Sequence, residues 1–399
     1  MNIIGIVCEY NPFHKGHAWQ IAASRAALGE NSVVVCAMSG DYVQRGEAAA
    51  FTKFARAEAA CRCGADLVFE LPLPWAVSSA EGFARGAVYM LSGLGCTHLS
   101  FGSEHGAVKS LELLAGCLTD SGVIEEIKNR MSQKPKLSFA SARQEVLADV
   151  LGDTAILLEK PNNILAVEYI KAIKQLKSSM TPFTMVRRGC SHDEKGDGEF
   201  RSASELREML RRGIAPDMHI PAAAMEIFCR ELEQGRTALD QERIQLVILS
   251  RLRMLKENDF IRLPDGGDGA GQRLYGAVRT NVSLGKIVEA AAARRIPQAR
   301  ARRMCLCAAL GINKGMADGN PPYARLLAAN EKGCDFLRNI DNKSTISVVN
   351  KPASVKHLGR EAENVFALGA SAHDMYTLLY SSQEDRKAGQ DWRTGPKIV

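Results

Sequence analysis

Short apolar runs alternate with helix-forming stretches from the start of the chain, and this alternation constrains the fold more than any other feature. The run Ile3-Ile4-Gly5-Ile6-Val7-Cys8 is rich in β-branched residues, which favours a buried strand. Small and unbranched residues from His17 to a stop at Gly29 favour a helix. Further strands are expected at residues 33–38, 67–71 and 98–101, and helices at 51–63, 79–91 and 107–117. The alternation predicts an α/β fold with a Rossmann-like, doubly wound parallel sheet.

Two histidines stand where the first predicted strand gives way to the first predicted helix. A tight crossing, Glu9-Tyr10-Asn11-Pro12-Phe13, leads into His14-Lys15-Gly16-His17. Parallel sheets bind ligands at the carboxyl ends of their strands, and helix N-termini favour anions. Two imidazole donors at such a terminus predict a nucleotide triphosphate site with His14 and His17 as its catalytic residues. The alternative interpretation is one structural histidine near a turn and one on a solvated helix end.

No metal site is predicted from the histidines or the cysteines. The H-E-x-x-H spacing is absent, and two residues between the histidines would put them on different faces of a helix. Cys61 and Cys63, like Cys305 and Cys307, have a one-residue spacer, which is shorter than zinc sites use. All eleven cysteines are expected to be reduced thiols in a cytosolic protein. No apolar run is long enough to span a membrane, and no targeting segment is expected before the first strand.

Other polar residues of the first half are candidates for the same nucleotide. Ser202-Ala203-Ser204-Glu205 opens a helix with a capping-box pattern, and its hydroxyls, amides and Arg207 could bind phosphate. The same pattern also fits a helix that is merely capped. Arg187 and Arg188 follow a strand expected at residues 183–187 and suit phosphate neutralisation. Adjacent strand side chains diverge, so at most one of the two reaches the site without a bend.

A polar cluster follows the second predicted strand, and a polar tail ends the chain. The cluster of Gln44, Arg45, Glu47, Lys53 and Arg56 could line an acceptor pocket. Lys53 and Arg56 are expected on the solvated face of a helix instead. The polar tail after residue 381 is expected to be mobile.

The charge distribution predicts two domains of different character. At 399 residues the chain has room for both. Pro216 and Pro221 interrupt the chain near residue 213, so residues 1–213 are predicted to form the nucleotide-binding domain and 214–399 a mostly helical one. Residues 214–399 hold 27 Lys and Arg against 21 Asp and Glu, and therefore carry the whole formal charge of +6.

The basic excess is sharpest in residues 273–314, where nine Lys and Arg face one acid, Glu289. A concentrated basic stretch is the footprint of a polyanion site. The alternative is that these arginines solvate one face of a helix or pair with acids elsewhere. The candidate polyanion ligands are Arg294, Arg295, Arg300, Arg302 and Arg303.

The segment Asn11-Pro12-Phe13-His14-Lys15-Gly16-His17 resembles the ATP-binding signature of the HIGH-motif nucleotidyltransferases. More narrowly, the chain resembles the bacterial tRNA(Met) cytidine acetate ligases, in blocks over the first half and again around residues 300–312. The matching blocks are residues 7–14, 38–40, 43–47, 56–58, 64–72, 101–104 and 161–165.

The resemblance implies which residues bind ATP. Gly102 would let the backbone meet the adenosine, and Asn162 could either bind ATP or cap a helix. Glu104 would hold a ribose hydroxyl or be a solvated carboxylate, and Lys160 is a weaker candidate. The implied ATP-binding residues are Val7, Cys8, Glu9, Tyr10, Asn11, Pro12, Phe13, His14, Lys15, Gly16, His17, Ala18, Trp19, Gln20, Gly102, Asn162, Arg187, Arg188, Ser202, Ser204 and Arg207.

The resemblance also implies the reaction. Acetate and ATP, with Mg²⁺, would form acetyl-adenylate, and the acetyl group would pass to N4 of the wobble cytidine in elongator tRNA(Met). The basic second half would then bind tRNA. Two alternatives are a nucleotidyltransferase for a small coenzyme precursor and a non-catalytic RNA-binding protein. The chain departs from the family pattern at residues 269–272 and 293–296, which affects the expected tRNA contacts rather than the ATP site.

Overall fold

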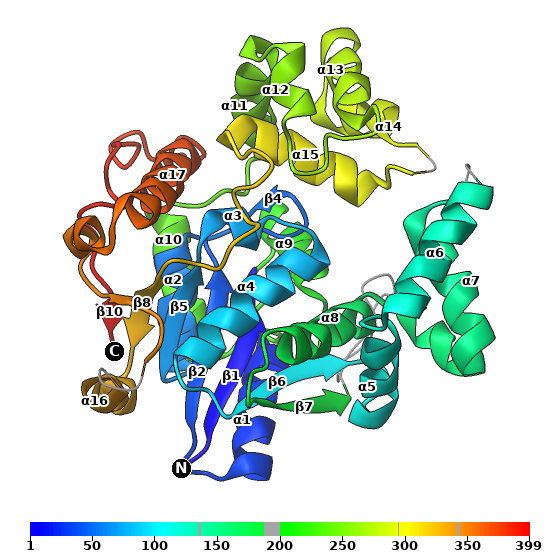
Figure 1. Ribbon diagram of the computed structural model, residues 1–399. Coiled ribbons are helices and arrows are strands. Elements are labelled where there is room, and N and C mark those ends of the chain that lie inside the picture. The colour runs from blue at the N-terminus through cyan, green and yellow to red at the C-terminus, as the bar shows by residue number, and fades with distance from the viewer. Residues whose placement is uncertain (135–136, 187–199, 294, 341–343) are drawn as a thin grey trace.

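A mostly parallel sheet forms the centre of the protein (Figure 1). The structure, a computed structural model, describes residues 1–134, 137–186, 200–293, 295–340 and 344–399. The sheet order is β10-β8-β5-β2-β1-β6-β7, with β9 paired to β8, and only β8 and β5 pair in antiparallel fashion. This confirms the predicted Rossmann-like α/β fold. The strands are β1 (Ile3–Cys8), β2 (Val33–Ser39), β5 (Leu67–Leu71), β6 (His98–Ser103), β7 (Thr181–Val186), β8 (Ala324–Ala329), β9 (Val348–Val349) and β10 (Lys397–Ile398), with β3 (Tyr42–Val43) and β4 (Glu47–Ala48) in a separate hairpin.

Helices connect the strands and continue into the second half of the chain. The stretches expected to be helical at residues 51–63, 79–91 and 107–117 appear as α2, α4 and α5. The helices are α1 (Lys15–Leu28), α2 (Lys53–Arg62), α3 (Leu73–Ala76), α4 (Ala80–Gly93), α5 (Val108–Cys117), α6 (Ser121–Gln133), α7 (Phe139–Leu151), η1 (Gly152–Glu159), α8 (Pro161–Gln175), α9 (Ala203–Arg211), α10 (Ala222–Glu233), α11 (Gln241–Met254), α12 (Glu257–Ile261), α13 (Ala270–Thr280), α14 (Leu284–Ala291), α15 (Gln298–Leu310), α16 (Glu331–Ile340), η2 (Pro352–Leu358) and α17 (Arg360–Thr377).

Strand β2 is buried along its whole length because helices cover both faces of the sheet. Successive side chains of a strand point to opposite faces. Accordingly, Val33 and Val35 pack into a core shared with α4 and α8, whereas Val34 and Cys36 pack into one shared with α2 and α10. Because these covered strands run parallel, their carboxyl ends lie together at one edge of the sheet.

Helices α11–α15 form a helical unit, drawn at the top of Figure 1, whose core is shared with β3, β4, α3 and α17. Other described elements after residue 213 lie at the sheet instead. Helix α10 packs on the sheet, and β8, β9 and β10 extend it. The domain boundary at residue 213 remains a prediction, but the segment after it contributes to both parts of the molecule.

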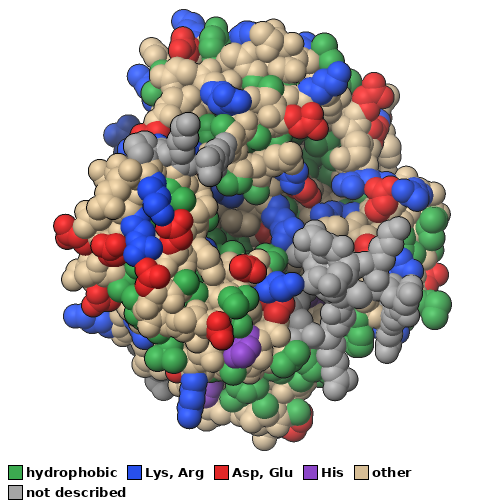
Figure 2. Space-filling view, turned by 90° about the vertical axis from the view of Figure 1, so that its right-hand side faces the viewer, with side chains coloured by type: hydrophobic (Ala, Val, Ile, Leu, Met, Phe, Trp, Pro, Cys, Tyr) green, Lys and Arg blue, Asp and Glu red, His purple; other side chains and the backbone are tan. Residues whose placement is uncertain are grey.

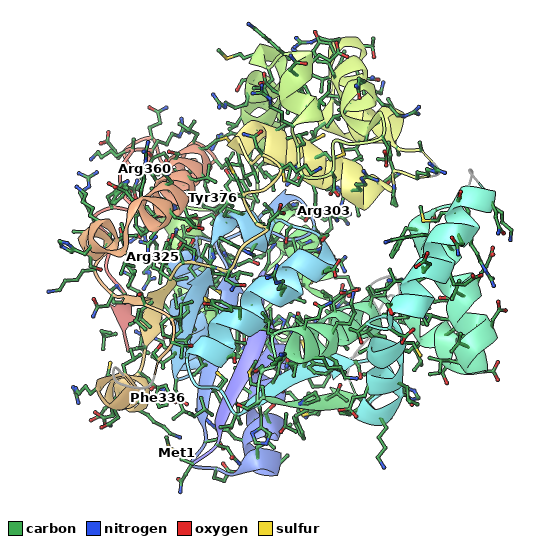
Figure 3. All side chains as sticks on the ribbon, in the orientation of Figure 1. Met1, Arg303, Arg325, Phe336, Arg360 and Tyr376 are labelled. Atoms are coloured by element: carbon green, nitrogen blue, oxygen red, sulfur yellow. The ribbon has the colours of Figure 1, made fainter. Side chains whose placement is uncertain are left out.

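A buried ion network contradicts two of the sequence-based expectations. Lys53 and Arg56 are 1% and 0% exposed rather than solvated. Lys53 Nζ lies 2.8 Å from Glu70 Oε1 and 2.8 Å from Asp391 Oδ2. Arg325 of β8, labelled in Figure 3, also lies 2.8 Å from Asp391 Oδ2. The tail expected to be mobile therefore supplies the carboxylate that allows two cations to be buried.

In the described part of the chain no helix is long and apolar enough to cross a membrane. Cys61, Cys305 and Cys307 are buried free thiols, as expected of small core residues. Among the same described residues, no group of three or more His, Cys, Asp or Glu side chains is placed to hold a metal ion.

Candidate active site

A cavity of about 900 Å³ opens at the carboxyl ends of β1 and β6 and extends to α15 of the helical unit. Its walls come from the ends of these strands, from the first turns of α1, α8 and α9, and from the β3–β4 hairpin. The face in Figure 2 is hollowed near its middle, with Lys and Arg side chains beside the hollow. The position is the one at which parallel α/β sheets bind ligands.

The two histidines lie together at the start of α1. His14 is the N-cap residue, and its Nδ1 accepts a hydrogen bond from Gly16 N at 3.1 Å. His17 Nδ1 accepts one from His14 N at 3.2 Å. The two rings stack with their centroids 3.7 Å apart. The expectation that they occupy different faces of a helix is wrong, because residues three apart share a face and His17, at N3, is placed to bond back to the N-cap residue His14.

A second helix N-terminus, that of α9, forms another wall. Ser202 caps it in a capping box, donating to Glu205 Oε2 at 3.0 Å and accepting from Glu205 N at 3.3 Å. Arg207, one turn later, donates to Asn11 O at 2.9 Å and so ties α9 to the crossing after β1. Ser202 thus caps α9, and Ser202 and Arg207 both line the cavity, so their phosphate-binding role stays a prediction.

Arginines of the basic stretch reach the cavity from α15. Arg302 and Arg303 both line it, and Arg303 is labelled in Figure 3. Arg302 Nη1 lies 3.3 Å from Glu47 Oε1, while Arg207 Nη2 lies 3.2 Å from the other oxygen of Glu47. Arg303 lies 3.2 Å from Asp265 Oδ2. Part of the basic stretch is therefore paired with acids, as the alternative interpretation held.

The β3–β4 hairpin touches α15 through backbone atoms. Gly46 has φ +79°, and a Cβ there would lie 2.8 Å from Arg303 N and 2.9 Å from Arg302 C. Only glycine permits this approach without a shift. The contact places the hairpin residues Gln44, Arg45 and Glu47 in the cavity wall, as proposed for an acceptor pocket.

The far wall is the N-terminus of α8. Glu104 Oε1 accepts from Asn162 Nδ2 at 2.6 Å, and its Oε2 accepts from Asn163 N at 3.0 Å. Asn163 Oδ1 in turn accepts from Glu104 N at 3.0 Å. Glu104 is therefore not a solvated carboxylate. Its two oxygens bind the first turn of α8 and fix it in place. Gly102, at the end of β6, lines the cavity next to it.

The family follows from comparison with known proteins. A family described as HIGH Nucleotidyl Transferase matches residues 1–391. The tRNA(Met) cytidine acetate ligase of Acetivibrio thermocellus is 32% identical over 98% of each chain. That of Caldanaerobacter subterraneus subsp. tengcongensis is 35% identical over 96% of each. The chain belongs to the tRNA(Met) cytidine acetate ligase family of HIGH nucleotidyl transferases.

Solved structures agree with this family. The crystal structure of apo Thermotoga maritima TmcAL superposes with a TM-score of 0.94 and 29% identity, covering all of both chains. A second structure of that protein, bound with alpha-thio ATP, gives a TM-score of 0.92 over the same coverage. The resemblance stated from the sequence is confirmed, and so is the fold.

Most residues that the family resemblance assigned to ATP surround one cavity. The assignment itself is not tested by their position. Pro12, Phe13, Lys15, Ala18 and Ser204 do not line the cavity. Arg187, Arg188 and the predicted tRNA ligand Arg294 lie outside the described residues. The assigned residues that line the cavity are Val7, Cys8, Glu9, Tyr10, Asn11, His14, Gly16, His17, Trp19, Gln20, Gly102, Asn162, Ser202 and Arg207.

Sequence reasoning missed much of the apolar wall. Phe83, Phe101, Tyr169 and Phe200 line the cavity. A signal was present for Tyr169, because it lies seven residues after Asn162 on the same face of α8. Nothing local marks Phe83, which sits among the core residues of α4. Lys160, rated a weaker candidate, also lines the cavity.

Proposed function

We propose that the protein is an ATP-dependent ligase that joins acetate to cytidine in tRNA(Met). One observation carries this proposal: the cavity joins the two-histidine terminus of α1 to the terminus of α9 and to the basic helix α15. The first two elements suit a polyphosphate, and the third suits a nucleic acid. The names of the relatives support the substrates, and the alpha-thio ATP bound by Thermotoga maritima TmcAL supports ATP.

In the first step an acetate oxygen attacks the α-phosphorus of ATP, and pyrophosphate leaves. Acetate is already ionised, so the step needs positioning and charge neutralisation rather than a base. His14 and His17 supply donors at the positive end of α1, and Arg207 supplies a cation at α9. The family-assigned residues listed above, including Arg187 and Arg188, form the proposed ATP site.

Mg²⁺ is proposed to accompany ATP. This ion keeps several water ligands and is commonly held by one or two carboxylates together with substrate phosphates. Glu47 and Glu104 of the cavity already accept hydrogen bonds from arginines and from the start of α8, which fits an ion carried mainly by the nucleotide. The ion would neutralise charge on the phosphates while the chain orients them.

In the second step the acetyl group passes to the N4 amine of the wobble cytidine of elongator tRNA(Met). An anticodon base is single-stranded, so little extrusion is needed. Arg302 is the best-placed cation for tRNA, because it is 38% exposed and lines the same cavity. The remaining predicted contacts are Arg294, Arg295, Arg300 and Arg303. We place the enzyme in the cytoplasm, where this substrate is found.

The test is an incubation with ATP, radiolabelled acetate and total bacterial tRNA. We expect label in the RNA only when all three are present, and acetate-dependent exchange of pyrophosphate into ATP without tRNA. Digestion of the RNA should locate the label in cytidine. Exchange with no label in RNA would favour a small-molecule acceptor, and neither signal would favour a non-catalytic RNA-binding protein.

A further inference from the structure

The three carboxylates of the cavity differ in what already binds them. Both oxygens of Glu104 accept from the N-terminus of α8, and each oxygen of Glu47 accepts from an arginine. Glu9 Oε1 accepts from Gln44 N at 2.8 Å, and within the described part of the chain no residue donates to its Oε2. The side chain is partly exposed and lines the cavity. Glu9 therefore has a carboxylate oxygen available to a substrate.

The two histidines are arranged as donors rather than as proton acceptors. Each Nδ1 accepts a hydrogen bond from a backbone N–H, of Gly16 and of His14 respectively. A ring nitrogen that accepts a hydrogen bond carries no proton, so the neutral ring holds its proton on Nε2. In the neutral rings the hydrogen-bond donor is therefore Nε2–H. Neither ring can take a proton from an amine without losing its contact to the backbone.

The backbone and side chain of Glu9 are held from two sides. Arg56, which is 0% exposed, donates to the carbonyl oxygens of Glu9 and Ser39, at the ends of β1 and β2. Gln44 N fixes the carboxylate. Burial raises the pKa of Glu9, and the hydrogen bond from Gln44 and the nearby arginines, Arg45 first, offset only part of this rise. The carboxylate is thus a stronger base than an ordinary glutamate.

We propose that Glu9 is the general base of acetyl transfer and accepts a proton from the exocyclic amine of cytidine. This inference rests on the proposed function. The amine nitrogen bonds to the carbonyl carbon of acetyl-adenylate, the bond from that carbon to the phosphate oxygen breaks, and AMP leaves with the electron pair. The amine proton moves to Glu9 Oε2 and then to solvent. Because acetate activation needs no base, loss of the carboxylate should affect transfer most.

Glu9→Gln is the decisive variant, since the amide keeps an oxygen for the Gln44 N–H but cannot take up the proton. Acetate-dependent exchange and single-turnover transfer to tRNA(Met) are measured from pH 5 to 9. We expect transfer to fall about 100-fold or more, exchange to fall much less, and the transfer profile to lose its acidic inflection. Glu9→Asp should keep the inflection at a lower rate. Glu226→Gln, at an exposed position of α10 that does not line the cavity, is the control and should also keep the inflection.

The possible results distinguish the proposed function from the proposed role of Glu9. Native protein without acetate-dependent exchange would refute the proposed function and with it this role of Glu9. Suppose instead that the native protein carries out both exchange and transfer, and that Glu9→Gln transfers at a rate within a few-fold of native. The amine proton would then go to water or to the departing phosphate, and not to Glu9. A Glu9→Gln variant that loses exchange and transfer equally, with its inflection intact, would make Glu9 a binding residue only.

Discussion

Asp391→Asn should destabilise the protein strongly, although this residue lies only eight positions before residue 399. Asp391 is 1% exposed, and its Oδ2 lies 2.8 Å from both Lys53 Nζ and Arg325 Nη1. Burial on its own would raise the pKa of Asp391, but Lys53 and then Arg325 lower it well below the usual range. The carboxylate is therefore charged in the folded state. Neutralising it leaves two buried cations to share Glu70, with Asp41 Oδ2 3.8 Å from Lys53 Nζ.

The magnitude follows from this residual pairing. Removing one partner of a buried ion pair costs about 3–5 kcal/mol, because the remaining charge is left uncompensated. Glu70 still lies 2.8 Å from Lys53 Nζ and 3.3 Å from Arg325 Nη1. We therefore expect Asp391→Asn to lower the free energy of unfolding by about 3 kcal/mol, the lower end of this range. With a urea m-value of about 3 kcal/mol per M, the unfolding midpoint should fall by about 1 M.

Urea unfolding monitored by circular dichroism tests this estimate. Glu384→Gln is the control, because Glu384 lies on the same segment and is exposed. It should change the free energy of unfolding by less than about 0.5 kcal/mol. Lys53→Met combined with Asp391→Asn should cost less than the two changes added together. A loss below about 0.5 kcal/mol for Asp391→Asn would show that the tail does not hold the network together.

Three further changes test the site and its supports. His17→Ala should abolish pyrophosphate exchange while leaving the urea midpoint nearly unchanged; near-normal exchange would refute its role. Gly46→Val should cost about 1–3 kcal/mol through its positive φ and its contact with α15, measured by unfolding against Gly285→Ala. Burial lowers the pKa of His373, but the charge and hydrogen bond of Asp41, with Asp391, raise it above its usual value, so this stabilisation is full below about pH 6.5 and is lost as pH rises through the folded pKa. Between pH 6 and pH 9 the urea unfolding midpoint of the native protein should fall more than the midpoint of the His373→Gln variant.

The elements that local sequence determines were predictable. Strand β1 and the terminus of α1 follow from β-branched residues, a crossing and two histidines within 17 positions. The capping box at Ser202 is likewise a local pattern, and the structure has it. The parallel sheet followed from alternation, because strand–helix units leave few other arrangements.

Features that depend on distant partners were not predictable. Lys53 looked like a solvated helix residue because its neighbours in sequence do not include Asp391, which lies 338 positions later. The stacked histidines were an exception, since their i, i+3 spacing already places them on one face, and the prediction of different faces misapplied the helical period. Strand β8 joins the sheet in antiparallel orientation from beyond the helical unit, and a single sequence does not show such a return.

The ion pairs of this protein fall into two groups that suit different purposes. The network of Lys53, Arg325 and Asp391 is buried, so breaking it is costly and it holds distant segments together. Glu47 instead joins Arg207 and Arg302 where the carboxylate is 31% and Arg302 is 38% exposed. Exposed pairs contribute about 1 kcal/mol or less, so a substrate phosphate can replace Glu47 on Arg302 at small cost, while Arg207, 11% exposed, keeps the carboxylate in place. The cations at the cavity are therefore held in position before substrate arrives and remain exchangeable when it does.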